Sequence, residues 1–180
     1  TLTVDIVDGS ANSVSSPSVT FSALGFGFSS QNSTGTLGAA AQKIRVLNTR
    51  STVTWTMSIA ATSGSTALWD GGTFKYDYND HSGTSDGSDS DSYGGQLTLD
   101  PNVGTLAAVA PCASTTGITK GSSAAYSETA PVISSISILS AGGSASTNCK
   151  WDFTGASLSQ AVPGSQPAGT YTISLTITVV

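Results

Sequence analysis

Charged side chains are scarce in this chain, and groups suited to acid–base chemistry are scarcer still. Only 9% of the 180 residues are charged, and the chain holds a single His and a single Glu. Few candidates are therefore left for a general acid, a general base or an activated nucleophile. We expect a protein that is not an enzyme.

Basic clusters and long apolar runs are also missing. The six Lys and Arg residues are spread singly along a chain of net charge −5. This charge balance argues against nucleic acid and anionic lipid surfaces as partners. No run of about 18 apolar residues occurs, so the sequence predicts no transmembrane segment.

Short hydroxyl side chains take the place of the charges. The chain contains 32 Ser, 25 Thr and 20 Gly residues, and 38% of it is hydrophobic. Hydroxyl side chains compete for backbone hydrogen bonds and Thr is stiff at χ1, so this composition favours strands over helices. The hydrophobic fraction and modest net charge argue against disorder. Because the chain also begins at Thr1 without a Met, we expect a mature secreted or cell-surface protein whose signal peptide has been removed.

Strict alternation of apolar and hydroxyl residues is the dominant pattern. In Ser51–Ile59 the apolar residues recur at every second position from Val53, and Thr170–Val180 repeats the scheme from Tyr171. Strands with one apolar and one hydroxyl face belong to antiparallel sheets stacked on one core. We therefore predict an all-β fold, a single antiparallel β-sandwich domain over residues 1–180 with about eight to ten strands. Further strand candidates are Thr1–Val7, Val19–Phe21, Lys43–Leu47, Thr73–Tyr78, Gln96–Leu99 and Val132–Leu139.

Two motifs lie toward the ends of the chain. The first is Gln42–Arg50 (QKIRVLNTR) followed by Trp55–Met57 (WTM), and the second is Pro167–Tyr171 (PAGTY) followed by Leu175–Val179 (LTITV). Together they resemble the two signatures of the WxL surface domains of Gram-positive bacteria. In those signatures an arginine-containing strand precedes Trp-x-Leu, and a Tyr precedes Leu-Thr-Trp-x-Leu.

The resemblance implies a secreted β-sandwich that is not an enzyme and that attaches non-covalently to the cell wall. The sequence departs from the signatures at Met57, which replaces a Leu, and at Ile177 and Val179, which replace the second Trp and Leu. The C-terminal Gly169-Thr170 and the alternating strand that follows also resemble secreted pilin-like subunits.

Seven of the eleven acidic residues lie between Asp70 and Asp100, around a Ser-, Gly- and Asp-rich stretch. The run Asp89–Gly94 (DSDSYG) resembles the start of an EF-hand-type calcium loop, with carboxylates at its first and third positions, and Asp100 stands at the twelfth. The alternative is a solvated loop near residues 77–95 whose Asp side chains cap turns. The expected Ca²⁺ ligands are Asp86, Asp89, Asp91 and Asp100, with Asp77 and Asp80 in reserve.

Cys112 and Cys149 are the only two cysteines, and the single His81 lies far from both in the sequence. This set is too small for a zinc site. Two buried free thiols are one interpretation. The hydroxyl-rich, charge-poor composition of extracellular character favours a disulfide between them.

The three tryptophans have two interpretations. Trp55, Trp69 and Trp151 are candidates for an aromatic platform that contacts glycan or cell wall. The alternation around Trp55 favours a place in the core instead, whereas Trp69 and Trp151 lie in less regular sequence where either could be exposed. Asn32 begins the chain's only Asn-x-Ser/Thr sequon and is a candidate for glycosylation.

The two terminal strands lack the residues that normally prevent an edge strand from pairing with another chain. Thr170–Val180 has no charge and Thr1–Val7 has only Asp5, although exposed edges normally carry Lys, Pro or a bulge. We therefore expect a calcium-stabilised structural protein that self-associates into a homopolymer, a fibre or layer, by terminal strand exchange. Either terminal strand could be the donor, and the N-terminal strand is favoured because Asp8–Pro17 has the composition of a flexible tether. The alternative is that both terminal strands pair within their own domain. The alternative function is a surface module that binds cell-wall or other glycan.

Overall fold

The predicted all-β fold is confirmed. The computed structural model describes residues 1–80 and 94–180, and within these ranges the regular elements are fifteen β-strands and one 3₁₀ turn, η1 (Gly64–Thr66). In this part of the chain no helix is long or apolar enough to cross a bilayer. The strands are β1 (Leu2–Val7), β2 (Gln31–Leu37), β3 (Lys43–Asn48), β4 (Trp55–Ala61), β5 (Leu68–Asp70), β6 (Lys75–Asp77), β7 (Asn79–Asp80), β8 (Gly95–Asp100), β9 (Thr105–Val109), β10 (Ile118–Lys120), β11 (Ala124–Ala125), β12 (Ser135–Ala141), β13 (Cys149–Thr154), β14 (Ala156–Val162) and β15 (Leu175–Val179).

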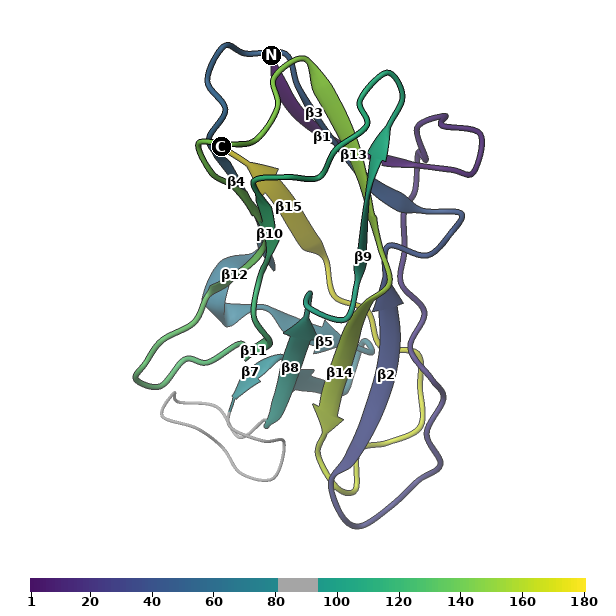
Figure 1. The fold of residues 1–180 in the computed structure, drawn as a ribbon. Coiled ribbons are helices and arrows are strands. Elements are labelled where there is room, and N and C mark those ends of the chain that lie inside the picture. Colours follow the sequence, from purple (N-terminus) through teal and green to yellow (C-terminus); the bar gives the residue numbers. More distant parts are fainter. Residues whose placement is uncertain (81–93) are drawn as a thin grey trace.

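Two antiparallel sheets form the two halves of one long, bent layer (Figure 1). One has the order β1-β3-β13-β9 and the other β11-β8-β14-β2. The bend coincides with two glycines of left-handed φ, Gly38 after β2 and Gly155 between β13 and β14, whose backbones are joined by a 2.9 Å hydrogen bond. Side chains are rare at such φ values, so glycine suits both positions. Such breaks divide long strands in two, which raises the strand count above the expected eight to ten.

The opposite layer is the sheet β10-β12-β4-β15, with the β5-β6 pair beside it (Figure 1). Along β4 the alternation predicted from the sequence is observed, because Trp55, Met57 and Ile59 are buried while Thr56 is exposed. Side chains from both layers form one buried cluster, which includes Ile44, Val46, Leu97, Leu99, Ile138, Phe153 and Leu158. Full burial of one such side chain stabilises the fold by roughly 1.5–3 kcal/mol.

The predicted disulfide between Cys112 and Cys149 is present, with a Cα–Cα distance of 5.6 Å. It joins the segment after β9 to the first residue of β13, two strands that are neighbours in the same sheet. The bond is compatible with a secreted protein, because disulfides persist in oxidising compartments.

One predicted strand is absent. Val19–Phe21 belongs to an irregular segment, residues 14–28, which we call the strap. The strap approaches β2, but the Ser22 hydroxyl accepts the Thr34 N–H and the Ser33 hydroxyl donates to the Ser22 carbonyl. A single backbone bond, from the Ser22 N–H to the Thr34 carbonyl (2.8 Å), is left between the two segments. Hydroxyl side chains thus replace the ladder that the alternation predicts.

Candidate functional site

The candidate site is the open side of the sandwich, where the edge strands β1 and β15 lie next to each other (Figure 1). β15 pairs only with β4. Val180 and Thr56 exchange both backbone bonds, at 2.9 and 3.0 Å. Because bonded and non-bonded pairs alternate in antiparallel sheets, the N–H and C=O groups of Leu175, Ile177 and Val179 point away from β4, toward the open side.

The backbone of β1 is arranged in the same way. The Thr49 N–H donates to the Thr1 carbonyl (2.7 Å), so in the β1–β3 ladder every odd-numbered residue of β1 is bonded to β3. The outward backbone groups belong to Leu2, Val4 and Ile6. The Val14 N–H donates to the carbonyl of Ile6 (2.8 Å), and no backbone hydrogen bond joins β1 to β15 in the part of the chain that the structure describes.

An apolar groove with a volume of about 570 Å³ lies between these strands and the strap. Val4 and Ile6 line it from β1, and Leu175 and Ile177 line it from β15. All four side chains are half-buried, although they point toward the core. Among the described residues, Asp5 is the only charged one along the groove. This place combines free backbone groups with apolar surface, the two features that an added strand needs.

Val19 and Phe21 of the strap also line this groove. The Phe21 ring packs edge to face on Trp69, with ring centroids 5.2 Å apart. Gly35 of β2 makes room for both strap side chains, because a Cβ at that position would lie 2.9 Å from Val19 Cγ1 and 3.3 Å from Phe21 Cδ2.

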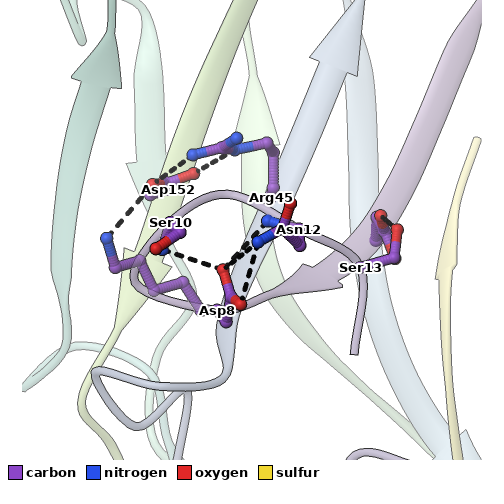
Figure 2. A network of polar contacts seen from close by, with 8 residues as sticks. Asp8, Ser10, Asn12, Ser13, Arg45 and Asp152 are labelled. Carbon is purple, nitrogen blue, oxygen red and sulfur yellow. Dashed lines mark hydrogen bonds and ion pairs between the residues drawn. The ribbon is translucent and has the colours of Figure 1, made fainter. Parts of the chain in front are cut away.

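The expected flexible tether after β1 is instead an ordered turn, at least over Asp8–Ser13 (Figure 2). The Asp8 carboxylate accepts the backbone N–H groups of Ser10 (2.8 Å) and Asn12 (2.9 Å). These hydrogen bonds, that from Asn12 foremost, lower the pKa of Asp8 below its usual value. Asx-type capping thus holds the turn that the composition alone predicted to be loose.

The outer face of β3 carries a row of charges beside this turn. Arg45 lies between Asp5 of β1 and Asp152 of β13 in the two registers, and its guanidinium binds Asp152 through two bonds of 2.6 and 2.8 Å (Figure 2). The hydrogen bond to Asp152 raises the pKa of Arg45 above its usual value. The Ser13 hydroxyl donates to Asp5. The Arg45–Asp152 pair thus joins β3 to β13, and the Ser13–Asp5 contact joins the turn to β1.

The tryptophans do not form an exposed platform. Trp55, Trp69 and Trp151 are only 3%, 7% and 1% exposed, so the interpretation of Trp69 and Trp151 as surface residues is wrong. The indole N–H groups of Trp69 and Trp151 have partners inside the protein. That of Trp69 donates to Gln160 (2.8 Å), and that of Trp151 donates to the Ser114 carbonyl (2.9 Å). Internal partners let both amphipathic rings enter the core without leaving a donor unsatisfied.

The expected calcium ligands fall into three groups. Asp86, Asp89 and Asp91 lie outside the described residues. Asp77 and Asp80 are 4% and 1% exposed, and Asp80 pairs with Gly95 at the start of β8. Asp100 is at the other end of β8, roughly 17 Å away at the usual rise of a strand, where it accepts the Asn102 N–H in a turn. Asp100 therefore cannot share an ion with Asp80.

Calcium binding stays a prediction. Within residues 1–80 and 94–180 no three His, Cys, Asp or Glu side chains form a group that could hold a metal ion. Asn32 is exposed near the start of the edge strand β2, where a glycan would be accessible, and its glycosylation likewise stays a prediction.

Sequence reasoning missed the groove and the strap that borders it. The alternating run Leu24-Gly25-Phe26-Gly27-Phe28 was a visible signal, but glycines take the place of the hydroxyl residues that mark the second face of the other strands. Comparisons with protein-family models, curated proteins and solved structures found no match to this chain. The resemblance to WxL domains and to pilin-like subunits therefore stays a prediction, and function is inferred from the geometry of the groove.

Proposed function

We propose that this chain is a secreted structural subunit that associates with further copies of itself by adding a strand at the β1–β15 groove. One observation carries the proposal: four residues of the two edge strands have outward backbone groups and also line the apolar groove, namely Val4, Ile6, Leu175 and Ile177. A strand laid there gains hydrogen bonds and buries apolar surface at once.

These two strands lack residues that block edge pairing, which supports the same proposal. β15 contains no charged residue or Pro, and β1 contains only Asp5, which is bonded to Ser13. Edge strands of monomeric proteins usually carry charged residues or Pro, because an open edge pairs readily with another chain. We assign no catalytic role to the groove. The alternative, glycan binding through tryptophans, loses its basis because all three indoles are buried.

The test places a lysine on the groove face and compares it with the same lysine one residue away. Ile177→Lys puts a charge among the groove residues, whereas Thr178→Lys adds it to the exposed face of the same strand. Ile177 is half-buried, so the lysine stem can follow the groove while its ammonium group reaches water, and we expect a loss of about 1–2 kcal/mol in stability.

Sedimentation velocity from low-micromolar to millimolar concentration, with negative-stain electron microscopy, gives the readout. The wild-type chain and Thr178→Lys should form larger species as concentration rises, and Ile177→Lys should stay monomeric while melting cooperatively. A wild-type chain that remains monomeric at millimolar concentration would overturn the proposal. Association of Ile177→Lys equal to that of the wild type would also overturn it.

A further inference from the structure

Three of the seven large hydrophobic side chains that are exposed in the described residues lie at the end of the strap. Leu24, Phe26 and Phe28 are 39%, 62% and 85% exposed, and the two phenyl rings contact each other edge to face with centroids 5.2 Å apart. Their contact places both rings on the same side of the segment, with Gly25 and Gly27 between the large residues. This is the pattern of a strand with one apolar face, and here that face is turned to water.

The fold of the chain itself does not account for this segment. Leu24–Phe28 belongs to no sheet. The Gly27 carbonyl accepts the Ser165 N–H (2.7 Å), and the next backbone bond, from Ser22 to Thr34, lies before the segment. By contrast, Val19 and Phe21 in the first half of the strap pack against the core. The Phe26 and Phe28 rings therefore add little to the stability of the monomer and expose apolar surface.

After Phe21, which lines the groove, the Leu24–Phe28 segment continues toward the end of the molecule at which β2 begins (Figure 1). The segment comes just before β2, whose first residue, Gln31, pairs with Val162 at the end of β14. The groove extends from Val4 of β1 and Ile177 of β15 to Phe21 of the strap. None of the residues from Leu24 to Phe28 lines the groove, so the segment does not fill the groove of its own chain in this structure.

The two surfaces are complementary. Leu24–Phe28 carries no charge, and Asp5 is the only charged residue that lines the groove in the part of the chain that the structure describes. In an extended chain, alternate side chains recur about every 7 Å, and the groove wall repeats at the same two-residue interval from Leu175 to Ile177. The glycines between the large residues leave the backbone of the segment open to approach by an edge strand.

We propose that Leu24–Phe28 of one copy docks in the β1–β15 groove of the next copy. This inference rests on the proposed function and names its donor, which is then the strap rather than either terminal strand. Because donor and acceptor are different surfaces, the contact is heterologous and joins the copies head to tail, so it propagates into a filament unless the rotation closes a ring.

The experiment removes the donor and leaves the acceptor intact. The double variant Phe26→Ser, Phe28→Ser changes two exposed rings and should fold like the wild type, as thermal melting will show. Phe74→Ser is the matched control, since Phe74 is 50% exposed and lies outside the strap. In sedimentation velocity the double variant should lose at least about 30-fold in association constant, the loss expected for an aromatic hot spot, while Phe74→Ser retains it.

A mixing experiment separates this inference from the proposed function. The donor-deficient double variant and the acceptor-deficient Ile177→Lys should each be monomeric alone, and together they should form dimers and nothing larger. If the wild type and the double variant associate equally while Ile177→Lys does not associate, the groove is the acceptor as proposed but the strap is not the donor. A wild type that never associates overturns both proposals. Loss of cell-wall glycan binding in the double variant with unchanged self-association assigns the rings to a glycan and overturns the inference.

Discussion

Gly35→Ala probes how the strap is seated on the sandwich. Gly35 lies in β2 beneath the strap, and an added methyl group would meet Val19 Cγ1 at 2.9 Å and the Phe21 ring at 3.3 Å. Carbon atoms pack best at about 3.5–4.0 Å, so the strap must move outward by roughly 0.6–1 Å. Overpacking of this kind destabilises a protein by about 1–3 kcal/mol.

A second glycine supplies the control. Gly143→Ala places its methyl group in open space, with no atom within 4 Å. Replacing glycine by alanine at a compatible site stabilises by about 0.4–1 kcal/mol, because the unfolded chain loses freedom. This gain is similar in both variants, so the difference between them isolates the contact with the strap. Gly35→Ala should be about 1–3 kcal/mol less stable than Gly143→Ala in urea unfolding.

Amide hydrogen exchange gives the local readout. The Ser22 N–H, bonded to the Thr34 carbonyl, should exchange faster in Gly35→Ala, whereas amides in the β14 ladder should be unchanged at equal global stability. Equal unfolding free energies and equal Ser22 exchange in both variants would refute the seating of the strap on Gly35.

Two further predictions concern stability. Reduction of the Cys112–Cys149 disulfide opens a loop with a sequence separation of 37 residues and should lower the free energy of unfolding by about 4 kcal/mol. Thermal melting with and without reductant measures this loss, and an unchanged melting temperature would contradict the prediction. Burial raises the pKa of Tyr76 and Tyr126 above 10, so the folded state holds these protons more tightly than the unfolded state. Stability is then full below pH 10 and should fall above it by up to about 1.4 kcal/mol per pH unit for each tyrosine, as urea unfolding with tyrosinate absorbance will show; a flat profile above pH 10 would contradict it.

Local patterns predicted the parts of the fold that depend on neighbouring residues. The two-residue period of Ser51–Ile59 predicted the buried face of β4, and the paired cysteines in a chain of extracellular composition predicted the disulfide. Both follow from short-range rules, the alternation of side chains along a strand and the chemistry of thiols. The unguarded terminal strands were visible in the same way, because the residues that block an edge are recognisable by type.

The features that shape the candidate site depend on which segments meet in space. The sequence could not show that Trp69 and Trp151 find internal partners for their indole N–H groups, because those partners lie far away along the chain. Nor could it show that Asp80 of β7 lies beside the first residue of β8, whereas Asp100 is the last residue of β8.

Composition and periodicity, by themselves, determined that this chain builds strands and stacks them on one core, since each strand carries its apolar face within its own sequence. Tertiary structure alone decided where the sandwich stays open. β1 and β15 come from opposite ends of the chain and became adjacent edges only through the pairing order of the two layers. The strap lost its predicted ladder because Ser22 and Ser33 bind the backbone through their hydroxyl groups, a competition that local propensity does not resolve.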